Sequence, residues 1–262
     1  MSCIANDDRY LMGDFYPTDD QKGQPIIVTD EIVEKFKSGV YPRMFHYYKQ
    51  FGMYILKFYL NFNWRYVIID DKLLADYRFK KPLIFASCAI VNEFWVPLIE
   101  KAYAKLYGSY QTLQGGALDE AVVDMTSFPS ERMTITMPNG VKQYAGKEDE
   151  FWAKILKNAR AGSLMGCSIS GATEAKRTDG LMSGHAYSLL DAFEITTTDK
   201  TQEKLLKIRN PWGSDEWLGD WCDGSIEIIN NADILNNKMK DLHGKEAEII
   251  DPHQNDGTFF MN

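Results

Sequence analysis

The sequence predicts an α+β protein, with helices in the first part of the chain and strands in the second. From Asn92 to Gly108 the apolar residues recur at the 3.6-residue period that is typical of a helix packed on a core. Beyond about residue 160, short apolar runs alternate with polar turns, which indicates strands. Segregated helices and strands are typical of α+β folds. With 262 residues, 45% of them hydrophobic, the chain can bury one large core or two small ones.

The first part of the chain contains three predicted elements. Thr29 is a candidate N-cap for a helix with Ile32, Val33 and Phe36 on its apolar face. Residues 53–59 and 64–69 predict a β-hairpin around Asn61-Phe62-Asn63. A helix capped by Asn92 and ended by Gly108 should bury one face, and Pro97 is expected to kink it. That face comprises Phe94, Trp95, Leu98, Ile99, Ala102, Tyr103 and Leu106.

The pattern changes around Ser127-Phe128-Pro129-Ser130, and we place a boundary there between a first lobe, 1–127, and a second lobe, 128–262. Asp149 is expected to cap a helix with Phe151, Trp152, Ile155 and Leu156 inward and Gly162 at its end. The predicted strands of this lobe span residues 164–169, 188–195, 205–208, 226–229 and 258–261.

Composition excludes several classes of protein. A net charge of −8 without a Lys/Arg cluster disfavours nucleic-acid binding. The widely spaced Cys3, Cys88, Cys167 and Cys222 predict neither a disulfide framework nor a zinc site, and free thiols favour a reducing, cytoplasmic location. The first residues lack the apolar segment of a signal peptide, and the longest apolar run, 83–91, is too short to span a bilayer.

The motif that points to chemistry is Gly184-His185-Ala186-Tyr187-Ser188, followed 25 residues after the histidine by Arg209-Asn210-Pro211-Trp212-Gly213. Two predicted strands joined by a turn should bring His185 and Asn210 together. An imidazole oriented by an amide and covered by an indole is the base-and-orienter half of a cysteine protease site. Asparagine, rather than aspartate, at the orienting position favours peptide hydrolysis over transglutaminase chemistry. Taken singly, a structural histidine and a turn with an aromatic plug are the simpler interpretations.

Three ordered blocks resemble the calpain catalytic core. The first runs from Gly184 to Asp223 and includes Glu216-Trp217-Leu218-Gly219-Asp220-Trp221-Cys222-Asp223. The second runs from Asn92-Glu93-Phe94-Trp95 to Tyr110, followed by Gly115-Gly116, and the third runs from Trp64 to Leu73 with Asp70-Asp71. The resemblance implies a two-lobed papain-like fold and calcium-dependent cysteine endopeptidase activity on intracellular proteins.

The same resemblance assigns roles to individual residues. His185 and Asn210 would be catalytic. Gly115, Gly116 and Gly184 would approach the substrate backbone, and Trp212 would shield the His–Asn hydrogen bond. Calcium would be bound by Glu216, Asp223, Gln254 and Asp256 in the second lobe and by Glu93 in the first. Thr258 stands where the family has a glutamate, which predicts weaker binding. Alternatively, these carboxylates only solvate loops and cap a helix.

The nucleophile is the part of the site that the sequence does not supply. Calpain-like nucleophiles lie in G-D-C-[WYF]-[FL]-[LM]-S-x-[IL], and Met1-Ser2-Cys3-Ile4 matches the last four positions. On this register the cysteine falls three residues before Met1, and Cys3 is structural. Cys88 and Cys167 are expected in the core, and Cys222 lies too close to Asn210 in sequence.

Two interpretations stay open. The chain is a calpain-type endopeptidase core truncated at its N-terminus, with protein or peptide substrates and further calpain-type domains on either side. Alternatively, it is an inactive calpain-like pseudoprotease that serves as a calcium-responsive binding or scaffold module. An α+β binding domain with no proteolytic ancestry is disfavoured by the three blocks.

Overall fold

The computed structural model describes residues 52–76, 78, 83–88, 93–136, 140, 142–244 and 256–262. The chain divides into two compact units between Arg132 and Met133. Two expectations stay predictions. One is the lobe boundary between residues 127 and 128, and the other is that the two units are the lobes of a protease. The expected helix after Thr29 lies outside the described residues. Within them, no helix is long and apolar enough to cross a membrane.

The unit before the division contains the predicted hairpin. Strands β1 (Met53–Leu60) and β2 (Asn63–Asp70) pair antiparallel along their whole length. Asn61 and Phe62 connect them with φ of 51° and 62°. Two left-handed residues give the tight turn whose twist matches that of the flanking strands. The turn is therefore shorter than the three residues that the sequence suggested.

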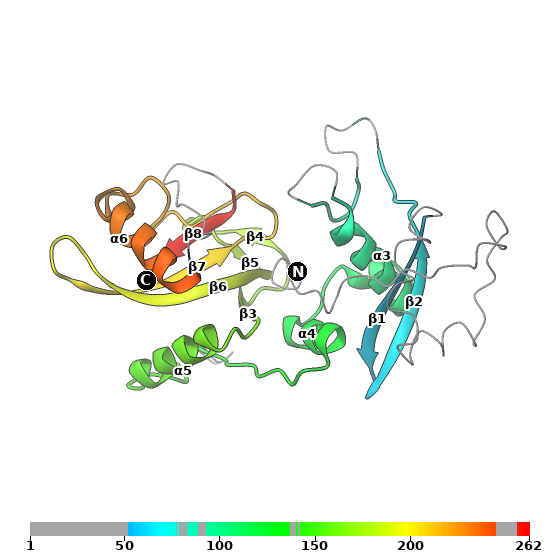
Figure 1. Ribbon diagram of the computed structural model, residues 1–262, viewed down its shortest axis with the longest axis horizontal. Helices are drawn as coiled ribbons and strands as arrows, with labels where there is room; N and C mark the ends of the chain where they lie inside the picture. The colour runs from blue at the N-terminus through cyan, green and yellow to red at the C-terminus, as the bar shows by residue number, and fades with distance from the viewer. Residues whose placement is uncertain are drawn as a thin grey trace. The chain divides into compact units, whose positions relative to one another are not determined.

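Two helices cover the hairpin, α3 (Trp95–Tyr107) on β2 and α4 (Leu118–Thr126) on β1, with a 3₁₀ turn, η3 (Gln111–Leu113), between them (Figure 1). A kink was expected at Pro97 because a helix capped by Asn92 would place this proline beyond its first turn. Because the helix begins at Trp95, Pro97 lies in the first turn, where a backbone N–H has no helical partner. The expected cap Asn92 lies outside the described residues, and Phe94 precedes the helix without a side-chain cap. The sequence did not predict α4, which at nine residues is too short to show a clear period.

The other unit contains an antiparallel sheet in the order β3-β6-β7-β8. Its strands are β3 (Met165–Ile169), β6 (His185–Thr196), β7 (Gln202–Arg209) and β8 (Thr258–Met261). A separate short pair, β4 (Ala175–Lys176) and β5 (Met182–Ser183), lies between β3 and β6 in the sequence. Helices α5 (Glu148–Arg160) and α6 (Ile226–His243) lie on opposite sides of the sheet (Figure 1).

A β-bulge in β6 lets one strand serve both faces of this sheet. The register with β7 shifts between Leu189 and Asp191. Before the bulge, Tyr187 and Leu189 pack with Ile155 of α5, whereas after it Phe193 and Ile195 pack with the buried residues of α6. An extra residue moves the following side chains to the other face. The bulge therefore lies between the end of β6 that carries His185 and the end whose side chains pack with α6.

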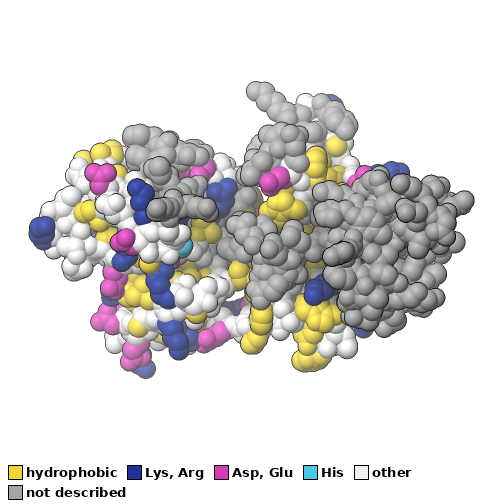
Figure 2. Space-filling model, in the orientation of Figure 1, with side chains coloured by type: hydrophobic (Ala, Val, Ile, Leu, Met, Phe, Trp, Pro, Cys, Tyr) yellow, Lys and Arg dark blue, Asp and Glu magenta, His cyan; other side chains and the backbone are white. Residues whose placement is uncertain are grey.

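Helix α5 begins two residues earlier than expected, at Glu148 with Lys147 at the N-cap position, so Asp149 lies inside the first turn and is not its cap. Acidic residues in a first turn interact favourably with the helix dipole. The Asp149 carboxylate instead pairs with Lys204 Nζ of β7 at 2.6 Å. Acidic and basic side chains are interspersed over α5 in Figure 2. The helix thus presents a charged outer face and buries Ile155.

The strand expected at 226–229 was wrong, because these residues form the first turn of α6. The β-branched Ile226, Ile228 and Ile229 suggested a strand, but Ser225 caps the helix: its Oγ accepts a hydrogen bond from Ile228 N at 3.3 Å. The buried Ile228, Leu235 and Met239 then lie on one helical face. The cap and this longer spacing outweigh the local strand preference.

Replacing the cap tests this account of α6. We expect Ser225→Ala to lower the free energy of unfolding by about 1 kcal/mol, because the Ile228 N–H loses its acceptor. Ser225→Asp should retain most of the stability. Denaturant titration measures both, with Ser163→Ala, an exposed position after α5, as the matched control. An equal effect of the two alanine substitutions would contradict the capping role.

Candidate active site

His185 is the first residue of β6 and is buried, with 7% of its surface exposed. Gly184, just before it, has a φ of +68°, and its N–H donates to the Ile169 carbonyl at 2.8 Å. A Cβ at Gly184 would lie 2.7 Å from the Thr173 carbonyl oxygen. The glycine therefore allows the segment around Thr173 to cross directly over the start of β6. This close approach explains why glycine is needed at position 184, independently of any contact with a substrate.

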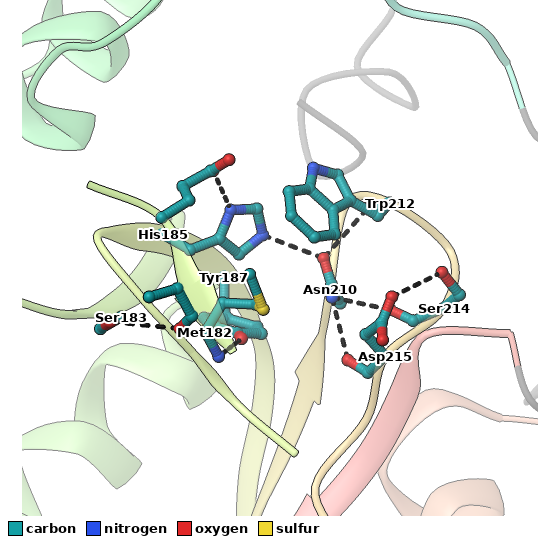
Figure 3. A network of polar contacts seen from close by, with 10 residues as sticks. Met182, Ser183, His185, Tyr187, Asn210, Trp212, Ser214 and Asp215 are labelled. Atoms are coloured by element: carbon teal, nitrogen blue, oxygen red, sulfur yellow. Dashed lines mark hydrogen bonds and ion pairs between the residues drawn. The ribbon is translucent and has the colours of Figure 1, made fainter. Parts of the chain in front are cut away.

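Asn210 follows β7 and is completely buried, yet its side chain has a full set of partners. Its Nδ2 donates to the carbonyls of Ser214 and Asp215 at 2.7 and 2.9 Å. Its Oδ1 accepts from Trp212 N at 3.1 Å and lies 3.0 Å from His185 Nε2 (Figure 3). Two carbonyls can face only the amide nitrogen, so the oxygen must face the imidazole. Nε2 of His185 therefore carries a hydrogen.

Trp212 lies over the pair, as Figure 3 shows. Its ring centroid is 4.5 Å from that of His185, and 46% of its surface remains exposed. Tyr187 also meets the imidazole edge-on at 5.0 Å and accepts a hydrogen bond from Met182 N at 2.7 Å. The imidazole therefore contacts two aromatic rings. Water is thereby kept from the His–Asn hydrogen bond, which strengthens it.

The second imidazole nitrogen has a partner that the sequence analysis missed. His185 Nδ1 lies 2.7 Å from Glu174 Oε1, a carboxylate eleven residues earlier in the chain. Glu174 immediately precedes β4, in the segment between β3 and the start of β6. No periodic pattern singles it out in the sequence. The pair of glycines that allows this segment to fold back, Gly171 and Gly184, is the only sequence signal for such a contact, because a Cβ at Gly171 would lie 2.7 Å from Gly184 N.

Cys88, Cys167 and Cys222 are all free thiols, and Cys3 lies outside the described residues. Burial raises the pKa of the Cys167 thiol to about 11. The pKa of Cys222 is also raised, first by burial and then by the negative charges of Asp223 and Glu227. Thiols with raised pKa values are almost entirely protonated at neutral pH and are poor nucleophiles. Neither of these two thiols is therefore suited to attack a peptide.

The structure brings together three of the carboxylates expected to bind calcium. Glu216 Oε1 accepts a hydrogen bond from Gly257 N at 2.6 Å. Burial raises the pKa of Glu216, the negative charge of Asp256 raises it further, and hydrogen bonds from the backbone and with Asp223 oppose these effects. A divalent cation would relieve this concentration of negative charge. Nevertheless, in the described part of the chain no group of three or more His, Cys, Asp or Glu residues is arranged to hold a metal.

The other predicted site residues are placed as follows. Gln254 lies outside the described residues. Glu93 Oε2 accepts a hydrogen bond from the Trp95 indole at 3.1 Å, so it interacts with the start of α3. A Cβ at Gly115 or Gly116 would meet no described atom within 4 Å, so packing does not require glycine at either position.

Comparison with known proteins agrees with the motif blocks. The profile of the calpain family cysteine proteases matches residues 28–262. Mouse (Mus musculus) calpain-8 is 37% identical over 234 residues, which cover 87% of this chain and 30% of that protein. Mouse calpain-9 is 38% identical over 180 residues, 67% of this chain and 24% of the relative.

A plant relative, the calpain-type cysteine protease DEK1 of Arabidopsis thaliana, is 33% identical over 217 residues, 82% of this chain and 9% of the relative. The chain thus spans less than a third of the length of these relatives. Because the family profile covers nearly the whole chain, and the fold that it implies is the α+β fold observed, this protein belongs to the calpain family of cysteine proteases.

Proposed function

We propose that this chain is the base-bearing part of a calpain-type cysteine endopeptidase, with His185 as general base and Asn210 as its orienting residue. The hydrogen bond between His185 Nε2 and Asn210 Oδ1 carries the proposal. Since Asn210 accepts the Nε2 hydrogen, a neutral imidazole keeps its lone pair on Nδ1. Nδ1 is then the nitrogen that faces an attacking thiol.

The reaction that this arrangement supports is peptide hydrolysis through an acyl-enzyme. A cysteine thiol at Nδ1 passes its proton to His185, and the thiolate adds to the peptide carbonyl. The imidazolium then donates that proton to the leaving amine. His185 next takes a proton from water as the water oxygen adds to the thioester carbonyl. The carbon–sulfur bond then breaks, the carboxylic acid product leaves, and the imidazolium returns its proton to the thiolate. Asn210 holds the imidazole in one orientation throughout, and it accepts no proton.

Substrate would bind as an extended peptide. We assign its backbone contacts to Gly115, Gly116 and Gly184, with Trp212 beside the catalytic pair, by their match to the family motif. We further propose that the two compact units are the two lobes of the protease, and that the free thiols reflect a cytoplasmic location. Additional calpain-type domains would accompany the chain, since the relatives are several times longer.

We propose Glu216, Asp223 and Asp256, with Gln254, as a calcium site, and Glu93 as a ligand of a second. The electrostatic contacts of Glu216 with Asp223 and Asp256 support the first site. Gly257 links it to the catalytic pair: its N–H donates to Glu216, and its carbonyl accepts from Asn210 N at 2.7 Å. Calcium at these carboxylates would therefore influence the backbone that positions Asn210.

The alternative is an inactive, calcium-responsive binding module. The contact between Glu174 and Nδ1 of His185 favours it, because a carboxylate occupies the position that a thiol needs. The two alternatives differ in whether His185 can activate a cysteine, and the following experiments distinguish them.

The chain of 262 residues should not hydrolyse casein-like substrates, even with saturating calcium, because the raised pKa values of Cys167 and Cys222 keep these thiols largely protonated at neutral pH. A fluorogenic casein assay measures this, with Cys3→Ser as the informative variant. Turnover that disappears in Cys3→Ser would make Cys3 the nucleophile and overturn the register given above.

Supplying a nucleophile tests the proposed role of His185 directly. We expect a chain extended in frame before Met1 by a Gly-Asp-Cys-Trp-Phe segment, together with the family's upstream oxyanion glutamine, to be labelled by a peptide epoxide. A helix N-terminus and His185 would both favour the thiolate. His185→Ala should slow labelling by about 10²–10⁴-fold, the usual contribution of a general base. Mass spectrometry of the labelled cysteine measures the rate.

In the same extended chain Asn210→Ala should slow labelling less than His185→Ala, because asparagine orients the base and takes no proton. The control is Asn230→Ala, an exposed asparagine of α6 outside the site. A folded extended chain that does not react would favour the binding module.

Calcium should raise the Tm of the chain, because a ligand that binds only the folded state stabilises it, by about 2.7 kcal/mol at a hundredfold excess over Kd. Glu216→Gln with Asp223→Asn should abolish this rise, and Asp233→Asn, an exposed control on α6, should not. Since the pKa of Glu216 is raised and calcium requires the carboxylate, the rise should shrink as pH falls through that pKa. An unchanged calcium response in the double variant would place the site elsewhere.

A further inference from the structure

The hydrogen-bond geometry around His185 requires one proton between its Nδ1 and the Glu174 carboxylate. Asn210 Oδ1 faces Nε2, so Nε2 is a donor. Glu174 Oε1 lies 2.7 Å from Nδ1, and a carboxylate oxygen and an imidazole lone pair repel each other at that distance. One proton must therefore lie between the two atoms. Either the imidazole is fully protonated beside a carboxylate, or a protonated Glu174 donates to it.

In both cases His185 cannot accept a further proton. Nδ1 is either protonated or engaged as the acceptor of a hydrogen bond, and the space in front of it is filled by a side chain. The same nitrogen is the one that the proposed reaction requires to be free. A charge-assisted pair of this kind is short and stronger than a neutral hydrogen bond. The described structure therefore shows the base in an occupied state.

The segment that bears Glu174 lies at the protein surface, where residues 171–178 are all exposed. Glu174 itself has 49% of its side-chain surface exposed, against 6% for His185. The β4–β5 pair that follows has only two residues in each strand, and both residues of β4 are exposed. Lys176 pairs with Asp215, and the Asp179 carbonyl accepts from Leu218 N at 2.9 Å. Exposed ion pairs contribute little, so such a segment can withdraw at modest cost.

We propose that Glu174 is an internal gate of the active site: its carboxylate occupies the thiol position at Nδ1 of His185, and must leave before His185 can act as a base. This inference rests on the proposed role of His185. The segment that bears Glu174 contacts the stretch from Asp215 to Leu218, so movement of that stretch would be transmitted to the gate. Substrate or a nucleophile would compete with Glu174 for the same nitrogen.

The protonation state and the occupancy can be tested separately in the 262-residue chain. In nitrogen-15 NMR spectra of the imidazole, the wild-type chain should show Nδ1 of His185 protonated or hydrogen-bonded to an acid proton. In Glu174→Gln, which keeps the size of the side chain, Nδ1 should have the signature of an unprotonated nitrogen accepting an amide hydrogen bond. An identical Nδ1 signature in the two proteins would overturn the gate.

Occupancy is measured by the reactivity of His185 toward diethyl pyrocarbonate, which attacks an unprotonated, accessible imidazole. Glu174→Ala should react about tenfold faster than the wild type or more, the factor expected when a charge-assisted hydrogen bond is lost. Glu150→Ala, an exposed glutamate of α5, is the matched control and should not change the rate. Peptide mapping assigns the modified histidine, and an unchanged Nε2 signal shows that the Asn210 bond persists. Equal rates in Glu174→Ala and the wild type would overturn the proposal.

Epoxide labelling of the extended chain separates this inference from the proposed function. If Glu174→Ala speeds the modification of His185 while the extended chain never labels, the gate stands and the protease role fails. If the extended chain labels in a His185-dependent manner and Glu174→Ala accelerates neither reaction, the protease role stands and the gate fails. With both correct, Glu174→Ala accelerates both reactions.

Discussion

The hydrogen bonding of Asn210 is the constraint on which the rest of the site depends. Its amide is buried without access to water and has a partner for each hydrogen and for the oxygen. A buried amide that loses a partner costs free energy, so the turn after β7 must keep its conformation for the amide to stay satisfied. This turn also places the Trp212 indole over His185. One side chain thereby fixes the tautomer of the imidazole, its orientation and its cover.

The backbone in β6 and next to β8 stabilises this arrangement. Across the bulge between Leu189 and Asp191, the side chains on the α5 face change from Tyr187 and Leu189 to Ala192, so that Phe193 and Ile195 can pack with α6. Just before the edge strand β8 begins, the Gly257 carbonyl accepts a hydrogen bond from Asn210 N. A Cβ at Gly257 would lie 2.8 Å from the Asn210 carbonyl oxygen, which accounts for the glycine. His185 and Asn210 are therefore both buried, whereas Glu174 approaches them from an exposed segment.

This contrast gives the two partners of His185 different roles. Asn210 is immobile, because its removal from His185 would also break bonds to three backbone groups. Glu174 is half exposed and can exchange its contact with His185 for water at small cost. If His185 is a general base as proposed, a permanent partner on one nitrogen keeps it oriented, and a removable partner on the other keeps it inactive until it is needed. The geometry around His185 meets both requirements.

The sequence by itself determined the fold class, the β1–β2 hairpin, helices α3 and α5, and the strands that bring His185 and Asn210 together. Periodicity, turn residues and motif spacing are local properties, and these elements depend on them. The sequence did not reveal α6, because the β-branched residues at 226–229 favour a strand. The Ser225 cap and the packing of α6 on the sheet stabilise a helix there instead. It likewise missed the short α4, whose position follows from packing on β1.

At the site the division is the same. The identities of His185, Asn210 and Trp212 follow from a motif that any reader of the sequence can find. Only the tertiary structure decided that the amide oxygen faces Nε2, since that depends on the carbonyls of Ser214 and Asp215 folding back onto Asn210. It alone placed Glu174 at Nδ1, because the contact arises where a segment crosses over Gly184 and leaves no periodic trace in the chain. Contacts between segments that meet only on folding have no local signature, and for that reason the sequence cannot specify them.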